Sequence, residues 1–212
     1  MQNPINRVDL LLVQHCHAVL AGLKVANYFC LRQSPQVKQA LLTWHESFAD
    51  SDLSFKVLCT CHDRFGILLY NHRLLAERLE DRAVQDFLKD YGYADFRVNQ
   101  ALKHLAKRLR EPLSNGKKLC LKQHFPHEIG VFLGYPLADI EAFIREGGQN
   151  ALLVGHWKVY HDVQAAKHCF DQYKLSLRLF RERLAAGNPL SESMLMVRAE
   201  LPQALASLRQ RA

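Results

Sequence analysis

Residues 55–70 read FKVLCTCHDRFGILLY, which places two apolar runs on either side of a polar turn. The first run is rich in strand-forming residues, and the second, Ile67-Leu68-Leu69-Tyr70, is short and apolar. The tetrapeptide Asp63-Arg64-Phe65-Gly66 is typical of a turn between two strands. The stretch therefore predicts an antiparallel hairpin.

Helical patterns surround this hairpin. Asn3 to Leu31 reads as mostly helical with a break near Gly22, and Ser34 is a typical N-cap for the helix that follows. Leu74 to Tyr91 predicts one or two helices, and Asp95 to Arg110 an amphipathic one. Further helices are expected over residues 126–133, 136–145, 162–186 and 191–209, and a short strand over 151–154. The predicted fold class is α+β, mostly helical, with a small antiparallel sheet packed by several helices.

Composition is that of a globular chain with one main core. The chain has 212 residues, of which 49% are hydrophobic and 23% charged. We expect a single α/β domain over residues 1–187 and a C-terminal helical appendage over residues 188–212, because Gly187-Asn188-Pro189 stops a helix. No apolar run reaches the roughly 18 residues of a membrane span. With no basic secretory start either, the sequence predicts a cytoplasmic protein without a membrane partner.

Basic residues outnumber acidic ones, for a formal net charge of +7. This excess favours an anionic partner, such as a small molecule, a cofactor with carboxylates, or nucleic acid; a solvated basic surface is the alternative. The chain has 11 histidines, which directs attention to metal or cofactor ligation. Its 6 cysteines are expected to be reduced thiols, most of them buried.

Cys120, His124, His127 and Glu128 form the most suggestive single motif. The first three are potential metal ligands, and Glu128 is suited to orient His127 or to act as a base. The motif lacks the H-E-x-x-H order of a zinc hydrolase. Alternatively, residues 126–128 simply begin a helix, where the helix dipole favours a glutamate.

A second motif, residues 155–161, reads GHWKVYH. Its aromatic residues can stack on a flat ligand, Lys158 can pair with acidic groups, and Tyr160 and His156 are residue types that ligate haem iron. A core tryptophan flanked by surface polar residues is the alternative. Near the N-terminus, Gly22 would let an anionic ligand approach the backbone closely, and Lys24 would supply a cation for it. The alternative is an ordinary helix with packed histidines and a surface lysine.

Other patterns favour structure over chemistry. Cys59 and Cys61 share a strand face, but no second thiol pair completes a zinc ribbon. Residues 129–144 resemble a helix-turn-helix, yet the second helix carries Asp139, Glu141 and Glu146 with Arg145 as its cation, a poor surface for phosphates. Walker, dinucleotide-binding and serine-hydrolase motifs are absent from the sequence.

Three stretches resemble a bacterial family known as domain of unknown function 3793. They are His15-Cys16 followed by residues 20–24 (LAGLK), the specific central run 125–136 (FPHEIGVFLGYP), and residues 155–160. The resemblance spans roughly Val13 to Ala186. It implies a cytosolic protein of anaerobic or facultative bacteria, often encoded near flavodoxin or iron-uptake genes, and implies no particular activity.

The chain departs from this family in one segment. Many members have cysteines around the segment that matches residues 151–156, where this chain has Ala151, Leu152 and Leu153, with His156 as the remaining ligand. A cysteine-ligated iron–sulfur cluster is therefore not expected there, whereas a histidine-based or non-metal site is.

Together these observations predict a binding protein or small enzyme of iron, haem or flavin-linked redox metabolism. Its pocket would join Lys24, His127, Glu128, Lys158 and Tyr160, with the lysines holding acidic groups of the ligand, His127 ligating or transferring a proton, and Tyr160 stacking or ligating.

Two alternatives remain. One is a nucleic-acid-binding module that uses the helix-turn-helix-like segment. The other is an adaptor that docks an acidic redox partner such as flavodoxin through Lys103, Lys107, Arg108 and Arg110.

Overall fold

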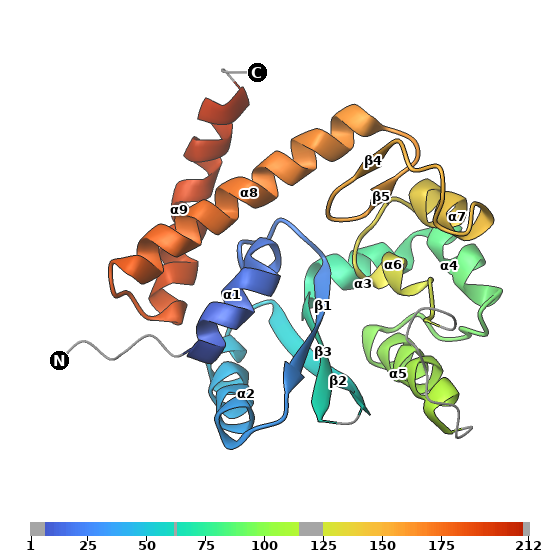
Figure 1. Ribbon diagram of the computed structural model, residues 1–212, viewed down its shortest axis with the longest axis horizontal. Helices are drawn as coiled ribbons and strands as arrows, with labels where there is room; N and C mark the ends of the chain where they lie inside the picture. Colours follow the sequence, from blue (N-terminus) through green and yellow to red (C-terminus); the bar gives the residue numbers. More distant parts are fainter. Residues whose placement is uncertain (1–6, 62, 115–124, 210–212) are drawn as a thin grey trace.

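The computed structural model describes residues 7–61, 63–114 and 125–209, and it is mostly helical with a small antiparallel sheet, as predicted (Figure 1). The helices of the described ranges are α1 (Arg7–Leu20), α2 (Pro35–Phe48), α3 (His72–Glu80), α4 (Arg82–Lys89), α5 (Val98–Ser114), α6 (Ile129–Phe132), α7 (Leu137–Arg145), α8 (Val163–Ala185) and α9 (Leu190–Arg209). The strands are β1 (Ala26–Arg32), β2 (Leu53–Cys61), β3 (Arg64–Asn71), β4 (Leu153–Val154) and β5 (Lys158–Val159).

The predicted hairpin is confirmed as β2 and β3. Within the described residues, the larger sheet has the strand order β1-β3-β2, and β2 pairs antiparallel with β3 from Leu53↔Asn71 to Cys61↔Arg64. The predicted turn is too long, because Arg64, Phe65 and Gly66 already belong to β3. These residues pair with β1 and β2 at once, and ladder hydrogen bonds on both sides outweigh the turn preference of Gly66.

The central strand β3 is covered on both faces. Side chains alternate along a strand, so Ile67 and Leu69 face one side, and Leu68 and Tyr70 face the other. All four side chains are buried. The sheet therefore separates two hydrophobic cores, one on each face.

The predicted helix over residues 3–31 is wrong in its C-terminal part, where the chain forms strand β1. Helix α1 ends at Leu20, and Gly22 adopts a left-handed φ of 77° that non-glycine residues rarely take. Residues 26–32 then run as β1 along β3, which buries Phe29 and Leu31 in the larger core. Pairing with a distant strand overrides the local helical pattern here.

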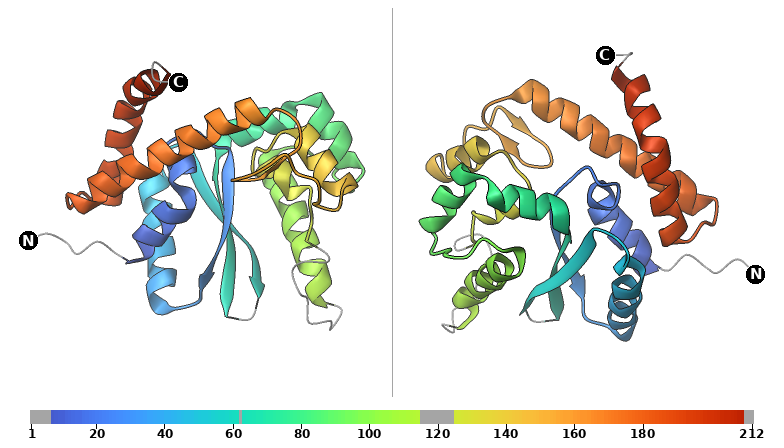
Figure 2. Two further views of the ribbon diagram at one scale, coloured as in Figure 1. Left: turned by 45° about the horizontal axis from the view of Figure 1, so that its top comes forward. Right: turned by 180° about the vertical axis from the view of Figure 1, so that it is seen from behind.

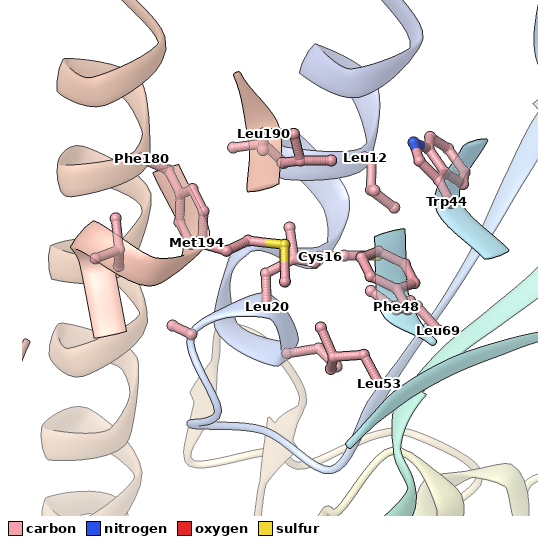
Figure 3. Packing of buried hydrophobic residues seen from close by; sticks show 14 of the residues in the cluster. Leu12, Cys16, Leu20, Trp44, Phe48, Leu53, Leu69, Phe180, Leu190 and Met194 are labelled. Carbon is pink, nitrogen blue, oxygen red and sulfur yellow. The ribbon is translucent and has the colours of Figure 1, made fainter. Parts of the chain in front are cut away.

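The larger core lies between the sheet and α1, α2, α8 and α9 (Figure 3). Trp44 of α2 and Phe180 of α8 are among its largest buried side chains. The predicted N-cap is confirmed, because Ser34 Oγ accepts a hydrogen bond from Val37 N–H. Helix α9 contributes Leu190, Met194, Val197 and Leu201, so the predicted C-terminal appendage shares this core with α1 and α8.

The second core lies on the opposite face of the sheet and is built mainly from α3 to α7. The predicted amphipathic helix is confirmed as α5, whose inward residues are Leu102, Leu105, Ala106 and Leu109. Residues 126–133, predicted as one helix, form only the short α6, which is joined to α7 by a turn.

Helix α8 links the two halves of the molecule. Asp162 caps it, accepting a hydrogen bond from Ala165 N–H. Its C-terminal half packs in the larger core, and its N-terminal half contributes Ala166 and Phe170 to a small third cluster with Val159 of β5 (Figure 2). Among the described helices, none is both long and apolar enough to span a bilayer.

Candidate functional site

A cavity of about 250 Å³, the first cavity, lies where α6, α7 and β5 come together. These elements are neighbours in Figure 1, at the end of the molecule opposite α9. Aromatic side chains form much of the wall, and aliphatic ones extend it. The lining comprises Phe125, Tyr135, Phe143 and Trp157, with Ile129, Leu133 and Ile140, Gly130, and the polar residues His127, Asp139, His156 and Lys158.

Asp139 holds the β5 segment against α7. Its buried carboxylate accepts hydrogen bonds from Trp157 Nε1 (2.8 Å), Tyr160 N–H (2.8 Å) and His161 N–H (3.1 Å), and His161 Nδ1 lies 3.1 Å from the same group. One side chain thus fixes both the indole in the cavity wall and the backbone beyond it. Sequence reasoning missed this role, because an aspartate in the first turn of a helix is already explained by the helix dipole.

Aromatic contacts position Trp157 further. Its ring stacks on Tyr135 with centroids 5.4 Å apart, and it meets Phe170 of α8 edge-on at 4.6 Å. The Tyr135 hydroxyl donates to the backbone oxygen of His156 at 3.0 Å. Burial raises the pKa of Tyr135 to about 12, so this phenol stays protonated and keeps donating.

Lys158 brings a cation to the first cavity. Its Nζ donates to the backbone oxygen of Gly148 at 2.5 Å and lies 5.8 Å from the centroid of the Phe143 ring. Gly148 follows α7, so the turn after this helix supplies the acceptor. Both contacts orient the ammonium group without neutralising its charge.

His127 and Glu128 are adjacent in sequence but lie in different surroundings. His127 is exposed, lines the first cavity and contacts Phe143 edge-on, with centroids 5.1 Å apart. Glu128 is completely buried, accepts a hydrogen bond from Arg108 Nε, and is not among the residues that line the cavity. A catalytic pair made of these two residues is therefore not assembled here, and Glu128 acts as the ion-pair partner of α5.

Lys24 lies beside the first cavity rather than in its wall. It is 5% exposed; its Nζ donates to Asn27 Oδ1 at 2.7 Å and sits 5.3 Å from the Tyr135 ring centroid. Burial lowers the pKa of Lys24 to about 8, although the nearby thiols of Cys16 and Cys169 act in the opposite direction. Within the described residues, the hydrogen-bond partner of Lys24 is a neutral amide, which is unusual for a buried ammonium group.

Two histidines extend this basic region. His17 is buried and lies 2.8 Å from Ser176 Oγ through Nδ1, and its ring centroid is 6.4 Å from that of His156. Burial, together with the positive charges of His156, Lys24 and Arg181, lowers the pKa of His17 to about 4. The neutral imidazole is therefore the resident form of His17 near neutral pH.

The remaining predicted site residues are not brought together in the described ranges. Tyr160 donates its backbone N–H to Asp139 and does not line the first cavity. Cys120 and His124 lie outside the described residues, so the predicted metal ligands are represented by His127 alone. Among the residues that are described, no group of three or more His, Cys, Asp or Glu side chains is placed to hold a metal ion.

A family model with the description "Protein of unknown function (DUF3793)" matches residues 12–194. The chain belongs to the DUF3793 family. The comparison with curated proteins and the comparison with solved structures each gave no match. Every residue that lines the first cavity of this DUF3793 protein lies inside the matched range.

The thiols of this DUF3793 protein are less buried than predicted. Cys16, Cys30, Cys59 and Cys169 are free thiols, and of these four only Cys16 is buried. Cys59 Sγ of β2 lies 3.2 Å from the hydroxyl of Tyr28 of β1, and the two side chains meet over Gly66 of the central strand β3. The expectation that most cysteines are buried is therefore wrong for the four, because strand and helix surfaces hold the other three.

Proposed function

We propose that this protein binds a small planar aromatic ligand that carries an acidic group, and that flavins are the class it best accommodates. The first cavity carries this proposal, because four aromatic side chains and the cation of Lys158 surround one space. Aromatic walls favour a flat π system, and an ammonium group in a half-buried setting favours a negative charge. His127 and His156, both exposed, add hydrogen-bonding nitrogen atoms to the lining.

Size supports a flavin ring over haem among the predicted cofactors. Pockets for drug-sized ligands usually enclose about 300–1,000 Å³. The first cavity has about 250 Å³, which suits a compact ring system better than a porphyrin. We assign the binding function to the cytoplasm, since the free thiols of the described residues are typical of a reducing compartment.

The two alternatives receive less support. Of the four cations that would dock an acidic redox protein, Arg108 is paired with Glu128, and Arg110 Nε donates to the backbone oxygen of Leu58. On the helix proposed to read DNA, Arg145 bonds Glu146, and Glu141 is exposed. Such a surface repels phosphates.

Titration with flavin mononucleotide tests the proposal, with quenching of flavin fluorescence as the readout. The wild-type protein should quench it saturably. Lys158→Gln should weaken binding by about tenfold, which corresponds to roughly 1.4 kcal/mol for a charge-assisted contact. The glutamine amide still offers a donor to Gly148, so the comparison isolates the charge.

Lys103→Gln is the matched control, because Lys103 is an exposed lysine of α5, remote in sequence from the cavity lining. Its affinity should equal that of the wild type. Absence of saturable quenching by the wild type contradicts the proposal, and so does a Lys158→Gln affinity equal to that of the control.

A further inference from the structure

A second cavity of about 580 Å³ lies on the other side of the β4–β5 segment. Its lining includes Gly155 and His156 from this segment and Lys167, Phe170 and Lys174 from α8. His156 lines both cavities, so the two spaces meet at this one residue. The two cavities are therefore neighbours.

The residues of α8 that line the second cavity lie on one face of the helix. Lys167, Phe170, Asp171 and Lys174 follow the spacing i, i+3, i+4 and i+7, which places them in one row along a helix. Gly155 permits the hairpin to approach this row closely, because a Cβ atom there would lie 2.2 Å from Phe170 Cε2. Gly155 therefore packs directly against Phe170 of α8 in the lining of the second cavity.

The charge around the second cavity is predominantly positive. Its lining carries two lysines, Lys167 and Lys174, and one carboxylate, Asp171, which lies 2.9 Å from Lys174 Nζ. The buried Lys24 is a further cation near His156. The pKa of His156 is lowered mainly by burial and further by the charges of Lys24 and Lys174, as expected in a region of positive potential.

We propose that the second cavity is a phosphate subsite, and that it holds the phosphate of the ligand whose ring occupies the first cavity. This inference rests on the proposed function. Lys167 and Lys174 supply the charge, and the ring and phosphate parts of the ligand would join near His156, which lines both cavities. Phosphate suits the site better than a carboxylate, because its higher charge and additional oxygens can engage two lysines at once.

The test compares flavin mononucleotide with riboflavin, which has the same ring and no phosphate. Wild-type protein should bind the mononucleotide about tenfold more tightly at low salt, from two charge contacts at a partly exposed site. The Lys167→Gln/Lys174→Gln double variant should lose this preference and bind riboflavin as the wild type does. Asp171→Asn, which removes the opposing charge, should strengthen the preference.

Salt provides an internal control. At about 1 M salt the screening length falls to about 3 Å, and the preference for the phosphate should nearly vanish while riboflavin binding persists.

The results of these titrations distinguish failure of the phosphate subsite from failure of the proposed function. Riboflavin and flavin mononucleotide binding equally well to the wild type would overturn the subsite and leave the ring cavity intact. A preference that survives in the double variant also overturns the subsite. If neither flavin binds, the proposed function fails, and the subsite fails with it.

Discussion

At the scale of single residues, Lys24 is the side chain that folding alone explains least. It is 5% exposed, and its hydrogen-bond partner, Asn27, is neutral. The surrounding ionisable groups include His17 and His156, which are basic. Burying a cation without a carboxylate destabilises a protein, so we attribute Lys24 to ligand attraction rather than to stability.

Lys24→Met is therefore expected to stabilise the protein. At pH 7 the free energy of unfolding should rise by about 1–3 kcal/mol, because the variant keeps the aliphatic stem and removes the desolvated charge. Urea unfolding with and without the substitution measures this difference. A destabilised variant would contradict our interpretation of Lys24.

The pH dependence of that difference follows from the pKa of Lys24. Burial lowers it to about 8 from its ordinary value of 10.5, so between these pH values the unfolded chain holds more protons than the folded one. Wild-type stability relative to Lys24→Met must then rise as pH increases through this window. The advantage of the variant should be full below pH 8 and should shrink toward pH 10.5. A difference that does not change with pH would argue against a buried charged amine.

At the scale of elements, the short hairpin of β4 and β5 depends on contacts from its neighbours. Each strand has two residues, and isolated hairpins are marginal in water even when they are longer. Asp139 of α7 holds the hairpin from one side through Trp157, Tyr160 and His161. Phe170 of α8 packs against it from the other.

Asp139→Ala should release the hairpin from α7. We expect a loss of about 2–4 kcal/mol in unfolding free energy, since several buried donors lose their acceptor together. Asp139→Asn should cost less, because its side-chain oxygen can still accept from the backbone N–H groups of Tyr160 and His161. Urea unfolding and amide hydrogen exchange at residues 158–161 provide the measurements. Equal stabilities for the two variants, or unchanged exchange in Asp139→Ala, would contradict the role given to this carboxylate.

At the scale of the whole molecule, local signals in the sequence predict much of the fold. The cap at Ser34 and the apolar stripe of α5 are set by neighbouring residues, and both are found where expected. Strand β1 was missed because its hydrogen-bond partner, β3, lies about 40 residues away along the chain. Local periodicity carries no information about such pairing.

The candidate site was predictable in its residue types but not in its assembly. His127, His156 and Lys158 do line one cavity, whereas Glu128 pairs with Arg108 and Tyr160 is not among the lining residues. The motifs identify ligand-capable side chains, but only packing decides which of them meet. Residues of the second cavity on α8 were missed for the same reason, since exposed lysines on a helix are ordinary in sequence.

Trp157 offers the most direct test of the central claim, that the first cavity binds a flat aromatic ligand. The chain has two tryptophans, and Trp44 is buried in the larger core, outside the residues that line the cavity. In Trp44→Phe, where Trp157 is the remaining fluorophore, flavin mononucleotide should quench the emission saturably. In Trp157→Phe, the emission of Trp44 should change much less at the same occupancy. Quenching that follows Trp44, or that fails to saturate in Trp44→Phe, would contradict the account.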